Sequence, residues 1–133
     1  YALELSAAED AVKNMTDQGL ERLRQIQAAQ REDLSNYNVD EFIRHDREFH
    51  SCIYEMSLNR ELMKLASNYY DVFRFLGMQV VMGTEERRLT TIEEHQDILE
   101  AMEQHNPKAA VQAMKKHMEQ TETNIRRHIK IAP

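Results

Sequence analysis

The chain has 133 residues, which fits a single domain spanning residues 1–133. Its formal net charge of −6 argues against direct binding of nucleic acid, because DNA-binding domains are usually basic. The single cysteine excludes an internal disulfide, and 3 Gly and 2 Pro are too few for the tight turns of an all-β fold. No apolar run reaches the ~18 residues of a membrane span, and no signal peptide is visible. We therefore expect a cytoplasmic, mainly helical protein.

Helical periodicity is visible from the N-terminus onward. The apolar spacing predicts a first helix over about residues 2–15. Thr16 or Asp17 is then expected to cap a second helix with Leu and Ile on one face. The polar end of this second helix, residues 31–37, is interpreted as a loop.

Two further helices are predicted in the middle of the chain. Asn38, with Glu41 three residues later, has the spacing of a capping box and predicts the start of a third helix that runs to about Ser57. After a short break at residues 58–60, a long apolar stripe predicts a fourth helix that ends at Gly83.

The last third of the chain predicts two more helices. Residues 82–90 are interpreted as a mobile loop, and Thr91 with Glu94 as the capping box of the fifth helix. Asn106 followed by Pro107 predicts the start of the sixth, with Asn as N-cap and Pro at the first helical position. The predicted fold class is all-α, an antiparallel bundle of six or seven helices.

Polar residues on predicted core faces are the most informative feature of the sequence. In the third helix, Phe42, Asp46, Phe49, His50 and Ile53 follow the spacing i, i+4, i+7, i+8, i+11. This spacing places the Asp and the His on the buried face, one helical turn apart.

Two more histidines follow the same rule on later helices. His95 lies three residues before Ile98 and four before Leu99, on the inward stripe of the fifth helix. His117 lies three residues after Met114, on the inward stripe of the sixth. The pattern therefore predicts one carboxylate and three imidazoles directed into one bundle from three helices.

A shared metal ion is one way to make such a buried polar group tolerable. Unpaired buried carboxylates are costly, and buried imidazoles need partners. Asp46, His50, His95 and His117 are therefore predicted metal ligands. Zn²⁺ is the first expectation, and Ni²⁺, Mn²⁺, Co²⁺ or Fe²⁺ also fit three imidazoles and a carboxylate. The alternative is that each histidine is an ordinary core or interface residue.

The remaining histidines and the cysteine do not fit this group. His45, His105 and His128 are predicted to lie on the surface, since none shares the inward line of the four residues. Cys52 lies off the line of Asp46 and His50 and is interpreted as a packed thiol rather than a nucleophile.

Four motifs in register resemble one known family. Asp46-Arg47-Glu48-Phe49-His50 resembles an Asp-x-x-Phe-His signature, and Asn59 stands where that family has an Asn opening the next helix. Two later blocks are also similar, namely Glu94-His95-x-x-Ile98-Leu99-x-Ala101 and Ala110-x-x-Ala113-Met114-x-x-His117-Met118. The family is the FadR C-terminal domain (FCD), the effector-binding half of FadR-type regulators in the GntR superfamily.

The resemblance implies a fold, a site and partners. It implies six or seven antiparallel helices, a homodimer through this domain, and a winged helix-turn-helix domain upstream that alone contacts operator DNA. It also implies a divalent metal on Asp46, His50, His95 and His117, the four residues that periodicity had selected.

The effectors of this family are small carboxylic acids, and the resemblance extends this expectation to the present chain. An arginine could hold such an acid through a bidentate contact. Arg74 matches a basic position of the family and is the first candidate, whereas Arg44 and Arg47 are weaker candidates that are expected to be solvated.

Two other function classes remain open at this stage. A metal with free coordination positions could activate water or O₂ in a hydrolase or oxygenase. Against an enzyme, Glu48 and Glu94 are neighbours of the ligands in sequence but are expected to point away, which leaves no general base. The second alternative is a structural helical dimerisation domain without metal.

Overall fold

Six helices make up the described part of the chain. The computed structural model describes residues 2–73 and 82–129, and the side chains of residues 2–68 and 82–127. The helices are α1 (Ala2–Asn14), α2 (Asp17–Ser35), α3 (Val39–Met56), α4 (Arg60–Phe73), α6 (Glu85–Glu103) and α7 (Pro107–Ile129). No strand occurs within these residues, so the predicted all-α bundle is confirmed.

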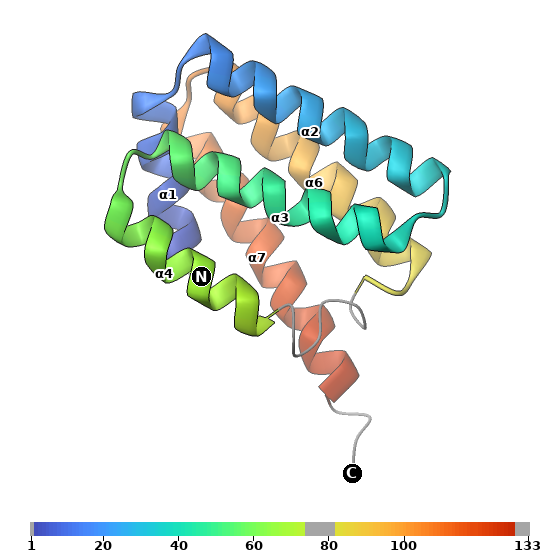
Figure 1. The fold of residues 1–133 in the computed structure, drawn as a ribbon. Coiled ribbons are helices and arrows are strands. Elements are labelled where there is room, and N and C mark those ends of the chain that lie inside the picture. Colours follow the sequence, from blue (N-terminus) through green and yellow to red (C-terminus); the bar gives the residue numbers. More distant parts are fainter. Residues whose placement is uncertain (1, 74–81, 130–133) are drawn as a thin grey trace.

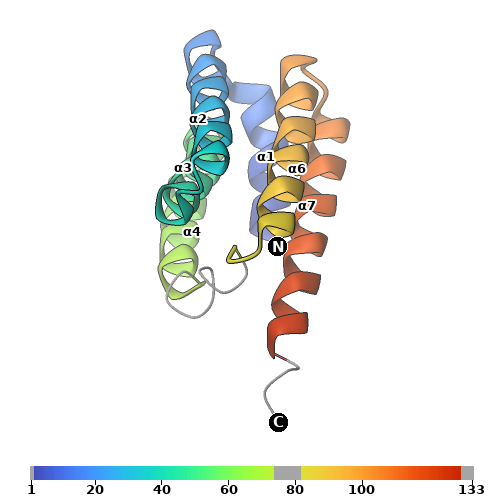
Figure 2. The same cartoon turned by 90° about the vertical axis from the view of Figure 1, so that its right-hand side faces the viewer.

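The helices form two layers with α1 between them. Figure 2 shows α2, α3 and α4 on one side and α6 and α7 on the other. In Figure 1, α2 and α3 lie side by side and run in opposite directions, and so do α6 and α7. Helix α1 contacts α3, α4 and α7, and α2 contacts α6, so the two layers close around a common interior.

Small residues allow the helices to approach closely. Ala7, Ala8 and Ala11 of α1 are fully buried where this helix contacts α3 and α7. At Gly19 of α2, an added Cβ would lie 2.8 Å from the Met56 sulfur, so a larger residue at this crossing with α3 would require the Met56 side chain to shift. The two layers are therefore held close enough for side chains of α3, α6 and α7 to meet.

The predicted helix caps are largely confirmed. Thr16 accepts a hydrogen bond from the Gly19 amide, and Asn38 accepts one from the Glu41 amide. Asn59 accepts from the Leu62 amide at the start of α4, and Asn106 accepts from an amide in the first turn of α7.

Two predicted boundaries are wrong. Residues 31–37 are not a loop, since α2 continues to Ser35. Residues 82–90 are mostly helical, since α6 begins at Glu85 and Thr84 is its N-cap, accepting from the Arg87 amide at 3.3 Å. Thr91 is therefore a fully buried interior residue of α6 rather than a cap. The polar run of residues 82–90 misled the prediction because Arg87 and Arg88 are buried despite their charge.

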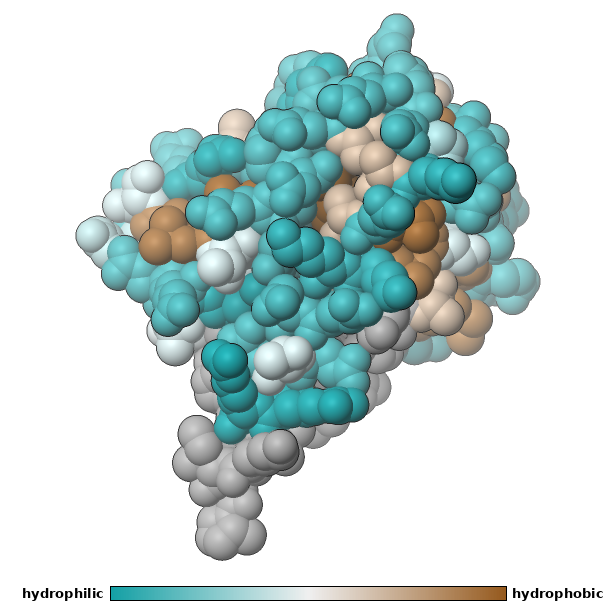
Figure 3. Space-filling model, turned by 180° about the vertical axis from the view of Figure 1, so that it is seen from behind, coloured by the Kyte–Doolittle hydropathy of each residue, from teal (hydrophilic) through white to brown (hydrophobic). Residues whose placement is uncertain are grey.

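The surface agrees with the composition. The face shown in Figure 3 is mainly hydrophilic, with apolar side chains confined to separate patches. Among the described residues, no helix is both long enough and apolar enough to cross a bilayer.

Candidate metal centre

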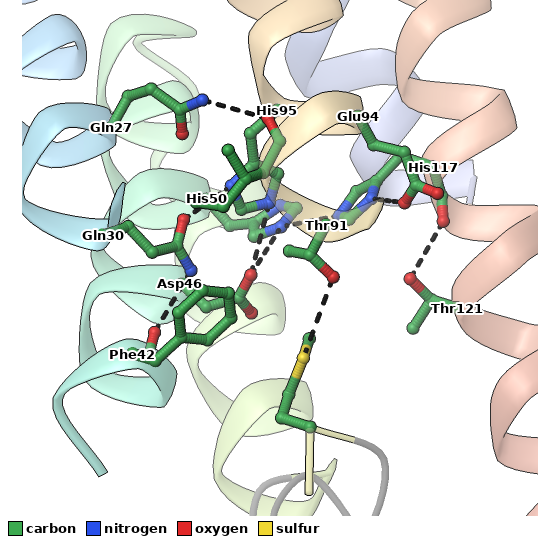
Figure 4. A network of polar contacts seen from close by, with 12 residues as sticks. Gln27, Gln30, Phe42, Asp46, His50, Thr91, Glu94, His95, His117 and Thr121 are labelled. Atoms are coloured by element: carbon green, nitrogen blue, oxygen red, sulfur yellow. Dashed lines mark hydrogen bonds and ion pairs between the residues drawn. The ribbon is translucent and has the colours of Figure 1, made fainter. Parts of the chain in front are cut away.

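The four predicted ligands meet inside the bundle. Asp46 and His50 extend from α3, His95 from α6 and His117 from α7, and each side chain is at most 3% exposed. One ligand atom from each residue lies within 4.8 Å of all the others. Figure 4 shows the three imidazoles and the carboxylate directed toward one another.

The histidines present their Nε2 atoms to a shared point. His95 Nε2 lies 3.2 Å from Asp46 Oδ1, and His117 Nε2 lies 3.2 Å from His50 Nε2. His50 Nε2 is 4.0 Å from the same Asp46 oxygen. Asp46 Oδ1 and His95 Nε2 are fully buried, yet neither makes a hydrogen bond of acceptable geometry. Such orphaned polar atoms are costly, and a cation between them would satisfy both.

The tautomer of His95 follows from its other nitrogen. Gln30 is fully buried, and its amide nitrogen donates to the Phe42 carbonyl, so the amide oxygen must face His95. That oxygen lies 2.9 Å from His95 Nδ1, which therefore carries the proton and donates. The lone pair of His95 is consequently on Nε2, the atom that faces the cluster.

A carboxylate fixes His117 in the same way. His117 Nδ1 donates to Glu94 Oε1 at 2.6 Å, leaving Nε2 to face the cluster. Glu94 is held in turn by two hydrogen bonds from the Arg87 guanidinium, each 3.0 Å long, and Arg87 also donates to Thr121. This arrangement is the carboxylate–histidine pair that orients metal-bound imidazoles.

The third imidazole has an acidic partner from another helix. His50 Nδ1 lies 3.5 Å from Glu4 Oε2 of α1, and both side chains are 3% exposed. Burial alone would lower the pKa of His50, but the adjacent carboxylate of Glu4 and the charge of Asp46 raise it. All three histidines thus have a partner on Nδ1 and direct Nε2 inward.

The other protonation states also favour a cation. Burial lowers the pKa of His95 to about 3 and also lowers that of His117, so both rings are neutral near pH 7 and can act as ligands. Burial would raise the pKa of Asp46, but close contact with His95 and the positive charge that His50 can carry hold it below its usual range. The site therefore offers one carboxylate and two neutral imidazoles, with His50 as the imidazole that takes up a proton most readily.

The donor set fits a divalent transition metal. Three imidazole nitrogens and one carboxylate oxygen suit Zn²⁺, Ni²⁺, Mn²⁺, Co²⁺ or Fe²⁺. An ion of this kind accepts more ligands than the four residues offer whenever its coordination number is five or six. The residues present therefore fit the group that the sequence predicted.

One expectation about the surroundings of the site is wrong. Glu94 does not point away from the ligands, since it is buried and bonded to His117. Helix α6 packs against both α2 and α7, so residues on two of its faces are buried, and the face toward α7 carries Glu94. The sequence analysis also did not single out Glu4, Gln30 or Arg87. The available signal was helical spacing, since Glu4 lies three residues before Ala7 and Gln30 four residues after Ile26, on the apolar faces of their helices.

The remaining candidates lie elsewhere. Arg74 lies outside the described residues, as does the side chain of His128, so their expected roles stay predictions. Arg44 is exposed and pairs with Glu41 and Glu48 on its own helix, as expected for a solvated arginine.

The other side chains set aside by sequence are mostly as expected. His105 is exposed. His45 was expected on the surface but is only 14% exposed and contacts Asp33 at 2.5 Å. The Cys52 thiol is buried, as predicted for a packed thiol, and burial raises its pKa to about 11, which disfavours the thiolate.

The fold and the site together define a helical domain with an internal binding centre. The model of the FCD domain matches residues 1–120, and the chain belongs to this family. The family provides the effector-binding regulatory domain of GntR-family transcription regulators, and such regulators are not enzymes. The resemblance noted in the sequence is confirmed.

Solved structures share the fold at low sequence identity. The chain is similar to Escherichia coli McbR/YncC, with a TM-score of 0.86 and 22% identity over 96% of this chain and 64% of that one. It is similar to Streptococcus agalactiae GntR, with a TM-score of 0.79 and 24% identity over 96% of this chain and 54% of that one.

A third structure extends the likeness. It is that of Lar, which controls the expression of the Listeria monocytogenes agr system and mediates virulence; its TM-score is 0.81, with 11% identity over 95% of this chain and 61% of that one. The chain thus spans less than two thirds of each of these proteins. No curated protein sequence matches it significantly.

Proposed function

We propose that this chain is the metal-dependent effector-sensing and dimerisation domain of a bacterial transcription regulator. In this proposal it works in the cytoplasm as a homodimer, and operator DNA is contacted by a separate N-terminal winged helix-turn-helix domain. The net charge of −6 supports this division, because an acidic domain repels the phosphate backbone. The solved structures that share the fold are also longer than this chain.

The observation that carries the proposal is the convergence of four buried ligand atoms. The orientation of the three imidazoles is fixed by partners on their Nδ1 atoms. Asp46, His50, His95 and His117 would hold the ion. When bound, the ion supplies a Lewis acid with positions left for the carboxylate of a small organic acid. Glu4, Gln30 and Glu94 keep the three imidazoles oriented whether or not the ion is bound.

The same residues give the site a route to a conformational response. The cluster joins α3, α6 and α7, and its supporting residues extend to α1 and α2. An acid that binds two arrangements of these helices with different affinity shifts the population between them. In a dimer, that shift would change the spacing of the attached DNA-binding domains.

The proposal is tested by thermal melting of the purified chain with and without a chelator. We expect wild type to contain one equivalent of zinc and to lose stability when the zinc is removed. His50→Ala and His95→Ala should bind zinc at least 100-fold more weakly, and the chelator should no longer change their melting temperature.

His105→Asn is the matched control. His105 is exposed and has a positive φ of 53°, which Asn tolerates, so this variant should retain zinc and the response to chelator. Metal-free wild type after growth in metal-replete medium, with no response to added zinc, would count against the sensor and favour a structural domain. Turnover of substrate by the zinc-loaded chain would instead favour an enzyme.

A further inference from the structure

Arg88 is a buried cation with no acidic partner among the described side chains. It is 7% exposed, and its guanidinium donates a hydrogen bond of 2.7 Å to the Met82 carbonyl. Within residues 2–68 and 82–127, no carboxylate lies at ion-pair distance from it. A guanidinium has five donors and remains charged at any ordinary pH, so one carbonyl leaves most of its bonding capacity and its whole charge uncompensated.

The preceding residue shows what a compensated arginine looks like in the same helix. Arg87 is 3% exposed and makes a bidentate ion pair with Glu94, with further bonds to Thr90 and Thr121. The two arginines are buried to a similar extent, yet in the described part of the chain Arg87 alone is paired with a carboxylate. Arg88 also lies in the first turn of α6, where the helix dipole is unfavourable for a cation.

Arg88 shares the inward stripe of α6 with the metal centre. The series Arg88, Thr91 and His95 follows the spacing i, i+3, i+7, so all three lie on one helix face. Thr91 is fully buried and its hydroxyl is directed toward the Met82 sulfur, at 3.8 Å. Figure 4 shows Thr91 beside the imidazoles. Two helical turns, a rise of about 10 Å, separate Arg88 from His95.

This placement suits a ligand with two separated acidic groups. One group would lie at the four-residue cluster, and the other would meet the guanidinium two turns away. An oxyanion that presents two oxygens side by side is the partner that an arginine fork binds best, and it would neutralise the charge of Arg88. Either a carboxylate or a phosphate has this chemistry, and a dicarboxylate has it at both ends.

We propose that Arg88 binds the distal carboxylate of a dicarboxylic acid effector whose other end lies at the Asp46, His50, His95 and His117 cluster. This assignment rests on the proposed function, because it presumes that the cluster holds a metal. It also separates two tasks within α6, since Arg87 supports a ligand of the metal and Arg88 contacts the effector.

The test is calorimetric titration of the chain, first with zinc alone and then, in the zinc-loaded state, with succinate, glutarate, adipate, acetate and inorganic phosphate. In wild type we expect one dicarboxylate to bind more tightly than acetate. Arg88→Met should weaken that dicarboxylate about 10- to 100-fold, to the level of acetate, because one charge-assisted bidentate contact is lost. Its zinc affinity should equal that of wild type.

Two further variants keep the result interpretable. Arg88→Lys retains the positive charge but not the bidentate fork, so it should lose less affinity than Arg88→Met. If circular dichroism shows that Arg88→Met is misfolded, Arg88→Lys takes its place in the test. Arg24→Met removes a surface arginine whose side chain is 40% exposed and should change nothing.

Each remaining outcome overturns one proposal. Unchanged dicarboxylate affinity in Arg88→Met, or no dicarboxylate binding in wild type, overturns the role of Arg88. Binding of phosphate but of no carboxylate overturns the choice of ligand. Failure of wild type to bind zinc overturns the proposed metal centre, and dicarboxylate binding that still depends on Arg88 would then leave the arginine site standing.

Discussion

The two walls of the metal centre are built differently. On the side of α2 and α3, His95 is held by the neutral amide of Gln30, which is itself anchored to the Phe42 carbonyl. On the side of α7, His117 is held by the carboxylate of Glu94, which is anchored by Arg87. A carboxylate partner makes an imidazole a stronger ligand than an amide does, because it stabilises charge on the ring.

The difference also concerns solvent. Gln30 is fully buried, whereas Glu94 and Arg87 line a groove of about 520 Å³ between α6 and α7. The side formed by Gln30, here called the amide wall, is therefore enclosed within the bundle. The side formed by Glu94 and Arg87, here called the carboxylate wall, borders the solvent. We infer that the carboxylate wall depends on a charge balance that the amide wall does not need.

The largest effect is expected from removing the charge that balances Glu94. Arg87→Met leaves this carboxylate mostly buried with only His117 as a partner, and should destabilise the chain by about 3–5 kcal/mol. Urea unfolding measures the change.

Arg87→Met combined with Glu94→Gln is the matched control for that prediction. It removes both charges and should recover much of the lost stability. If the single and double variants are equally unstable, the charge balance is not what holds this wall.

A smaller effect is expected when the carboxylate alone is neutralised. Glu94→Gln keeps the size of the side chain but weakens the orientation of His117, and should lower zinc affinity about 10- to 100-fold. Competition with a zinc-binding dye measures the affinity. An unchanged affinity would show that His117 does not need a charged partner.

The amide wall should respond less to the equivalent change. Gln30→Met keeps the apolar volume but removes the acceptor of His95 Nδ1, and should lower zinc affinity by about tenfold. The same dye competition applies. A loss larger than that of Glu94→Gln would reverse the ranking of the two walls.

The smallest effect is expected from acidification. Protons compete with the metal for imidazoles, so zinc affinity should fall as pH decreases from 7.5 to 6.5, by at most about tenfold if a single proton is displaced. His50 should protonate first, because Glu4 raises its pKa, whereas burial keeps His95 neutral. An affinity that is constant over this range would contradict competition between zinc and a proton at His50.

The sequence determined the helices and the inward ligands. Asp46, His50, His95 and His117 could be selected because helical periodicity states which residues of one helix share its buried face. The caps at Thr16, Asn38 and Asn106 are local as well, since each depends on an amide three residues away.

Only the tertiary structure decided which side chains orient the histidine ligands. Periodicity cannot state which side chains of different helices meet, so Gln30, Glu94 and Glu4 became partners of histidines only once α1, α2, α3, α6 and α7 were packed together. Helix α6 contacts helices on two sides and buries polar residues on both. For this reason its apolar pattern revealed neither its start at Glu85 nor the difference between Arg87 and Arg88. The cost of burying a charge depends on its partner, and that partner comes from another part of the chain.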